Sequence, residues 1–110
     1  MTDSEFSEVV DTTLLQVEEY IESLVDTLNL DADSSRSGNV LTLDFEDKGK
    51  IILNGQVTSH ELWVAARSGG FHYQRQGDEG WVNTRTGETF NSHFVAVLSQ
   101  QLGVPCPHLA

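Results

Sequence analysis

Residues 3–28 decide the fold of this protein, and they read DSEFSEVVDTTLLQVEEYIESLVDTL. Apolar side chains recur in this stretch every three or four residues, which is the spacing of an amphipathic helix. They are Phe6, Val9, Val10, Leu14, Val17, Tyr20, Ile21, Leu24, Val25 and Leu28. We therefore expect a long helix with one buried face, and Asp3 or Ser4 can cap its start.

Short alternating segments follow this helix. We expect an acidic edge strand over residues 29–34, with a loop reaching residue 39, and then strands over residues 40–45, 50–54, 59–66, 71–75 and 81–83. Turn-forming residues separate them at 46–49, 68–70 and 77–80. Such short connections favour antiparallel neighbours, because parallel pairing needs a long crossover.

A second helix is expected over residues 87–102, capped by Thr86 and stopped by Gly103 and Pro105. Both helices must bury one face, and a sheet can offer them one face. The simplest solution is a two-layer α/β sandwich of the α+β class. It has both helices on one side of a five- to six-stranded antiparallel sheet and leaves the other side open. The 110 residues suit one domain, 1–110.

Cysteine content and hydropathy limit the class of protein. Cys106 is the one cysteine of the chain, which rules out an internal disulfide and a cysteine-rich zinc or iron–sulfur site within one chain. The start of the chain has neither the basic nor the apolar part of a secretory signal, and no apolar run approaches the ~20 residues of a membrane helix. We expect a cytoplasmic protein that does not enter membranes.

The negative charge is concentrated in the first third of the chain. The formal net charge is −11, and residues 1–35 contain ten acidic residues but no Lys or Arg. The remainder holds seven acids and six bases, so it is close to neutral. A field of this kind repels nucleic acid and anionic lipid, and it attracts cations and basic protein surfaces.

The acids of the first helix lie opposite its apolar face. Glu18, Glu22 and Asp26 repeat every four residues, and like charges at this spacing each cost roughly 0.2–0.5 kcal/mol. No base on the helix offsets them, and acids near its C-terminal end oppose the helix dipole. Three interpretations remain open: a solubilising surface, a cation-binding surface, and a docking surface for a basic partner. Leu15 lies within this acidic face and is either a lone exposed residue or an apolar contact for that partner.

Carboxylate oxygens suit hard cations, and Fe²⁺ and Fe³⁺ also accept them. The sequence contains neither a calcium-loop pattern nor a His-Glu-x-x-His motif, so any metal should be held weakly, with many waters and little selectivity. A nucleophile elbow and a phosphate loop are also missing, and we do not expect an enzyme. The histidines at 60, 72, 93 and 108 are interpreted as ordinary surface residues.

The central strands carry a family resemblance. The run Ile51-Ile52-Leu53-Asn54-Gly55-Gln56, then Glu61-Leu62-Trp63-Val64-Ala65 and Ser68-Gly69-Gly70, resembles the signature of the frataxins. The runs Gly70-Phe71-His72-Tyr73 and Thr86-Gly87-Glu88-Thr89-Phe90, together with the acidic first helix, resemble bacterial frataxins of the CyaY type. One departure is Glu61, because the family usually has Gln at this position.

This resemblance implies the two-layer sandwich, a monomeric state without iron, and a role in iron–sulfur cluster assembly as a regulator or iron donor. It implies weak binding of Fe²⁺ and Fe³⁺, for which other divalent or trivalent cations can substitute. The metal-binding residues would be Asp3, Glu8, Asp11, Glu18, Glu19, Glu22, Asp26, Asp31 and Asp33. Cysteine desulfurase and the scaffold protein would be the partners. Their contacts would be Leu15, Glu18, Glu19, Glu22, Asn54, Gln56, Glu61 and Trp63. A ferroxidase enzyme and an iron-storage oligomer are the alternatives.

Overall fold

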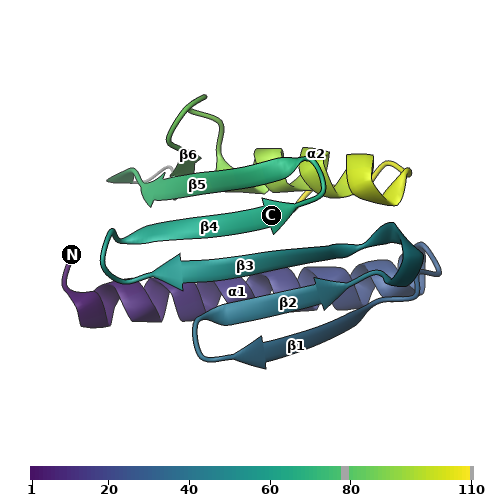
Figure 1. Cartoon of the computed structure of the whole chain (residues 1–110), viewed down its shortest axis with the longest axis horizontal. Helices are drawn as coiled ribbons and strands as arrows, with labels where there is room; N and C mark the ends of the chain where they lie inside the picture. The colour runs from purple at the N-terminus through teal and green to yellow at the C-terminus, as the bar shows by residue number, and fades with distance from the viewer. Residues whose placement is uncertain (78–79, 110) are drawn as a thin grey trace.

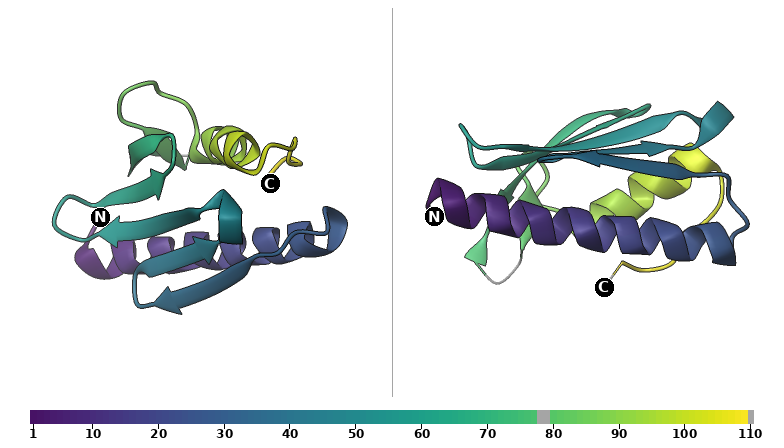
Figure 2. Two further views of the ribbon diagram at one scale, coloured as in Figure 1. Left: turned by 45° about the vertical axis from the view of Figure 1, so that its right-hand side comes forward. Right: turned by 90° about the horizontal axis from the view of Figure 1, so that it is seen from below.

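Two helices cover one face of a six-stranded antiparallel sheet in the computed structural model, which describes residues 1–77 and 80–109 (Figure 1). The elements in chain order are α1 (Asp3–Thr27), β1 (Asp33–Ser37), β2 (Val40–Asp44), η1 (Glu46–Lys48), β3 (Lys50–Gln56), β4 (Glu61–Ala66), β5 (Gly69–Arg75), β6 (Trp81–Asn83) and α2 (Phe90–Leu102). Each strand pairs with the next one in the chain, from β1 to β6. The expected sandwich is confirmed, and Figure 2 shows both helices beneath the sheet. The expected turn at 77–80 includes residues 78 and 79, which lie outside the described residues.

The core lies between the sheet and the helices. The side chains that α1 contributes to this core are Phe6, Val10, Leu14, Val17, Tyr20, Ile21 and Leu24. The central strands contribute Leu41, Leu43, Ile51, Leu53, Leu62, Val64 and Tyr73, and α2 contributes Phe90, Phe94, Val97, Leu98 and Leu102. Burial of these apolar side chains is the main favourable term in folding. Within the described part of the chain, no helix is long and apolar enough to cross a membrane.

The start of α1 differs from the expectation by one residue. Thr2 is the N-cap, in place of Asp3 or Ser4, because its hydroxyl accepts a hydrogen bond from the Glu5 N–H at 3.1 Å. Glu5 returns a carboxylate oxygen to the Thr2 N–H at 2.9 Å, which completes a capping box. Hydrogen bonding from the Thr2 backbone N–H and, to a lesser extent, from the Thr2 side chain holds the pKa of the Glu5 carboxyl below its usual range.

The expected first strand over residues 29–34 was wrong, because the strand begins four residues later. Asn29 has a φ of 54° and turns the chain out of the helix, and the Leu30 N–H bonds back to the Val25 carbonyl at 3.2 Å. Residues 35–37, which are expected in the loop, instead belong to strand β1. Its partner β2 is reached through a two-residue turn, since Ser37 lies opposite Val40. Gly38, with a φ of 57°, supplies the conformation that this tight turn requires.

The start of α2 was also wrong in the expectation. Thr89 caps the helix through a 3.4 Å contact with the Ser92 N–H, and the helix begins at Phe90. Thr86 belongs to the preceding turn, where the buried Asn83 side chain accepts hydrogen bonds from the N–H groups of Arg85 and Thr86. The expected end at Leu102 is confirmed, with Gly103 in the left-handed conformation.

The chain after α2 is tied back to α1. The Tyr20 hydroxyl donates a hydrogen bond to the Pro107 carbonyl at 2.5 Å, and Leu109 is buried against the core. Burial of this phenol raises the pKa of Tyr20 to about 12, with a further contribution from the nearby Cys106 thiol. The hydroxyl therefore stays protonated and able to donate through the neutral pH range.

Gly55 of β3 lets α1 approach the sheet closely. A Cβ atom at this position would lie 2.8 and 2.9 Å from the two methyl carbons of Val10. Contacts this short do not occur between real side chains, so a larger residue would have to push β3 and α1 apart. The glycine of the Asn54-Gly55-Gln56 motif therefore serves the packing of the first helix.

Gly55→Ala should lower the free energy of unfolding by about 1–3 kcal/mol, because the added methyl group overpacks the contact with Val10. Urea denaturation followed by circular dichroism measures this change. Gly70→Ala is the matched control, since a Cβ there meets only the Val64 carbonyl oxygen at 4.0 Å. Equal stabilities of the two variants would show that the approach of α1 does not depend on Gly55.

Candidate functional site

The outward face of α1 forms the first candidate surface, which we call the acidic ridge. Its members are Glu8, Asp11, Glu18, Glu19, Glu22 and Asp26. They lie within an arc of about 100° around the helix axis, opposite the buried face. Leu15 lies in the middle of this arc and is 50% exposed, as the sequence predicts. The surface thus combines clustered carboxylates with one accessible apolar side chain.

Three other acids expected on the ridge lie elsewhere. Asp3 is outside the arc, and its carboxylate contacts the His60 Nε2 atom in the turn before β4 at 2.8 Å. Asp31 lies in the connection between α1 and β1. Asp33 lies opposite Asp44 in the β1–β2 pair, on the sheet face that points away from the helices. The ridge is therefore shorter than the sequence indicates.

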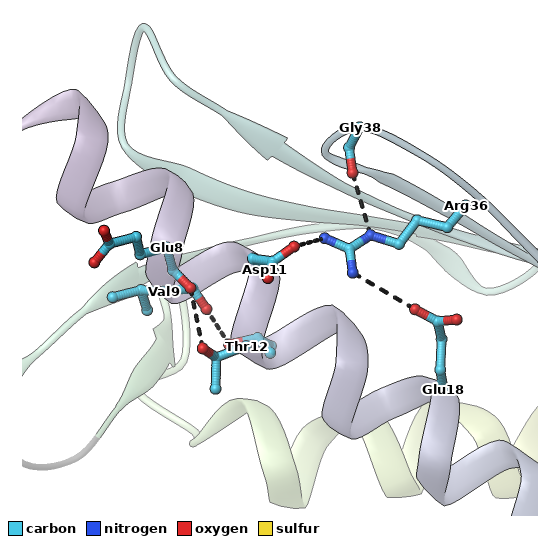
Figure 3. A network of polar contacts seen from close by, with 8 residues as sticks. Glu8, Val9, Asp11, Thr12, Glu18, Arg36 and Gly38 are labelled. Atoms are coloured by element: carbon cyan, nitrogen blue, oxygen red, sulfur yellow. Dashed lines mark hydrogen bonds and ion pairs between the residues drawn. The ribbon is translucent and has the colours of Figure 1, made fainter.

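A basic side chain from β1 reaches into the ridge (Figure 3). Arg36 forms ion pairs with Asp11 through its Nη2 atom and with Glu18 through its Nη1 atom, the latter at 3.7 Å. Its Nε–H also donates to the Gly38 carbonyl at 3.2 Å. Among residues 1–77 and 80–109, no other ridge carboxylate has an ion-pair partner.

The geometry of the ridge limits how a metal ion could be held. In the described part of the chain, no three His, Cys, Asp or Glu side chains converge as a metal site would require. The carboxylates follow one another along a single helix face and do not enclose an ion. Such a donor set fits hard cations that keep most of their water, with one or two carboxylates at a time. It does not fit a tightly held resident metal.

The open face of the sheet forms the second candidate surface, which we call the sheet patch. Strand pairing places its six residues on a small grid. One row is Asn54, Trp63 and His72, and the neighbouring row is Gln56, Glu61 and Gln74. The four residues expected at this place are thus brought together. They point away from α1, because Leu53, Leu62 and Tyr73 on the same strands point into the core.

Trp63 is the centre of the patch and is 37% exposed. Its indole N–H donates to Glu61 Oε1 at 2.8 Å, and its ring stacks on the His72 ring with centroids 4.3 Å apart. Gln74 donates to the other oxygen of Glu61 at 3.1 Å. The indole is therefore held in place by the Glu61 carboxylate and the His72 ring, and this exposed apolar side chain has little rotational freedom to lose on binding.

Sequence reasoning missed Arg36, His72 and Gln74 as members of these surfaces. The signal for Arg36 was present in the Gly38-Asn39 pair, because a two-residue turn there places Arg36 opposite the core residue Leu41. His72 and Gln74 alternate along β5 in register with Trp63 and Glu61. Their places could be found from sequence only by fixing the register of the β4–β5 hairpin.

Fold and surfaces together define a two-layer sandwich whose first helix carries an acidic ridge and whose open sheet face carries an exposed Trp. The frataxin-like domain family matches residues 1–104, so this chain belongs to the frataxin-like family.

Close relatives support this assignment. The iron-sulfur cluster assembly protein CyaY of Janthinobacterium sp. (strain Marseille) is 47% identical over 106 residues, covering 96% of this chain and 94% of the relative. The protein of the same name from Herminiimonas arsenicoxydans is 48% identical over 105 residues, covering 94% and 93%. The solved frataxin structure from Psychromonas ingrahamii matches with a TM-score of 0.75 at 31% identity, covering 96% of each chain.

Glu61→Ala should release the Trp63 indole, because it removes the acceptor at 2.8 Å. We expect the Trp63 indole N–H signal in the NMR spectrum to shift and to exchange faster with water. The indole of Trp81, which donates to the Thr13 hydroxyl in the core, is an internal control. Glu61→Gln keeps an acceptor and should change the signal less. An unchanged Trp63 signal in Glu61→Ala would contradict the described contact.

Proposed function

We propose that this protein takes part in iron–sulfur cluster assembly as a non-enzymatic regulator that binds iron weakly and docks on the assembly machinery. The observation that carries this proposal is the acidic ridge on a chain whose relatives, nearly half identical, are named iron-sulfur cluster assembly proteins. The sheet patch supplies a second surface of different chemistry. The two surfaces suit binding, since neither combines a nucleophile with a base.

Iron is proposed here as cargo or signal, and not as a resident cofactor. The outward carboxylates Glu19, Glu22 and Asp26 are spaced by three and four residues, so neighbouring pairs can contact one hydrated ion. Binding of this kind is weak and reversible, and other divalent or trivalent cations can replace iron. Weak binding also means that the ion can be passed on or can respond to its free concentration.

A basic surface of a cysteine desulfurase is the partner proposed for the ridge. Uncompensated carboxylates along one helix would steer such a surface into place, and the exposed Leu15 side chain would add an apolar contact within it. Cations and a basic partner would then compete for the same carboxylates. Iron would tune docking through this competition.

Reversal of charge on the ridge should weaken desulfurase binding. Glu19→Lys combined with Glu22→Lys spares the two partners of Arg36 and should lower the affinity roughly tenfold or more at low salt. Isothermal titration calorimetry with the cognate desulfurase measures the loss, which should shrink as salt is added.

The control for this experiment carries the same change of net charge at another place. Glu46 in η1 and Glu88 before α2 are exposed and lie off the ridge, so Glu46→Lys combined with Glu88→Lys should bind nearly as the parent protein does. Equal affinities of the two double variants would reject the ridge as the docking surface and leave only a general effect of charge.

The scaffold protein of cluster assembly is the partner proposed for the sheet patch. The patch and the ridge lie on different layers of the sandwich, so a protein docked on α1 leaves Trp63 accessible (Figure 2). An exposed Trp whose orientation is fixed by its neighbours is typical of an interface anchor. The two partners could then be bound at the same time.

Trp63→Ala should weaken scaffold binding at least about tenfold, because it removes the apolar centre of the patch. The free energy of unfolding should change little, since the side chain lies on the open face. Val104→Ala truncates a similarly exposed apolar residue, 37% exposed, in the segment after α2 and should leave binding unchanged. Fluorescence anisotropy with labelled scaffold protein measures the binding affinity of both variants. If Trp63→Ala binds the scaffold as tightly as Val104→Ala does, the sheet patch is not the scaffold-binding surface.

The ferroxidase and iron-storage alternatives are compatible with the same acids. Both would need sites that hold iron more firmly than a single helix face, and no specific observation favours either of them. They remain outcomes that iron-oxidation and light-scattering measurements would reveal.

A further inference from the structure

We propose that Arg36 is a resident counter-ion of the acidic ridge, which occupies the place between Asp11 and Glu18 that a bound cation would otherwise take. This inference rests on the proposed function, because it concerns the regulation of cation binding to the same surface. One arginine of β1 thereby determines which carboxylates of the ridge are available to bind a cation.

The contacts of the guanidinium group carry the argument (Figure 3). All three of its nitrogen atoms are engaged: Nη2 with Asp11, Nη1 with Glu18 at 3.7 Å, and Nε with the Gly38 carbonyl at 3.2 Å. Asp11 and Glu18 are seven residues apart, so they lie two turns apart on the same side of α1. A single positive group thus bridges two carboxylates that no residue of α1 itself could neutralise.

The surroundings make this pairing more than a loose surface contact. The side chains of Arg36 and Glu18 are only 23% and 24% exposed, whereas that of Asp11 is 65% exposed. Partial burial strengthens the attraction, and the carbonyl of Gly38 in the adjacent turn fixes the direction of the fork.

The ridge therefore has one part that is paired with Arg36 and another part that is open to cations. Asp11 and Glu18 are taken by Arg36, while Glu19, Glu22 and Asp26 face solvent without an ion-pair partner among the described residues. A cation should bind first at this C-terminal part of α1. A cation between Asp11 and Glu18 must displace the guanidinium, and this would break the ion pairs that join β1 to the helix. By linkage, the ion pairs of Arg36 lower the cation affinity between Asp11 and Glu18 by the same factor by which a bound cation weakens these ion pairs.

The test is a titration of ¹⁵N-labelled protein with Mn²⁺, whose unpaired electrons broaden nearby amide signals. In the parent protein, broadening should centre on residues 19–26. In Arg36→Gln it should extend to residues 11–18, and the apparent affinity for Mn²⁺ should rise about three- to tenfold at low salt, because one positive charge next to the ion is lost.

Three further variants separate the local effect from others. Arg85→Gln makes the same change of net charge after β6, at the opposite edge of the sheet from β1, and should raise the affinity by less than about twofold. Arg36→Lys keeps the charge without the fork and should lie between the parent and Arg36→Gln. Asp11→Asn with Glu18→Gln in the Arg36→Gln background should abolish the added broadening. If Arg36→Gln fails to fold, the Mn²⁺ affinities of Arg36→Lys and Arg85→Gln are compared instead. A higher affinity in Arg36→Lys supports the role of Arg36, and an equal or lower affinity overturns it.

The outcomes separate this inference from the proposed function. Broadening of residues 19–26 in the parent, with Arg36→Gln no different from Arg85→Gln, would overturn the role of Arg36 and leave weak cation binding intact. Binding in Arg36→Gln alone would support the role of Arg36 and overturn cation binding by the native ridge. Binding in neither protein would overturn both.

Discussion

The structure depends on the burial of one face of α1 against the sheet. Seven large apolar or aromatic side chains on this face are buried, from Phe6 to Leu24. Their removal from water stabilises the fold, and it also determines the direction of every other side chain on the helix. The carboxylates of the ridge are exposed because the helix cannot rotate without exposing its core. Gly55 permits the close contact with β3 through which this orientation is held.

The same constraint creates the second surface. With both helices on one side of the sheet, the other side has no cover, and alternate residues of β3, β4 and β5 face solvent. Glu61 lies beside the exposed indole on this surface and accepts hydrogen bonds from both Trp63 and Gln74. Its carboxylate therefore holds the indole in place and adds a negative charge beside it.

Arg36 connects the two layers of the molecule through charge. Acids spaced along α1 repel one another, and no base on the helix reduces this repulsion. The first base after the acidic segment meets them from β1, where it stabilises the edge hairpin and the middle of the ridge together. The acidic ridge is therefore already partly neutralised within the fold.

Local patterns in the sequence are enough to predict the periodic elements of this fold. The three- and four-residue periodicity of α1 predicts its buried face, its exposed acids and the exposure of Leu15. The alternation along β4 predicts that the Trp63 side chain lies on the other face of the sheet from those of Leu62 and Val64. The tertiary structure decided which distant residues meet: Arg36 with Asp11 and Glu18, His60 with Asp3, and His72 with Trp63. These contacts depend on where each strand starts and on its register. A shift of a strand by one residue turns its side chains to the other face, and only the packing of the whole sheet on its helices selects the register.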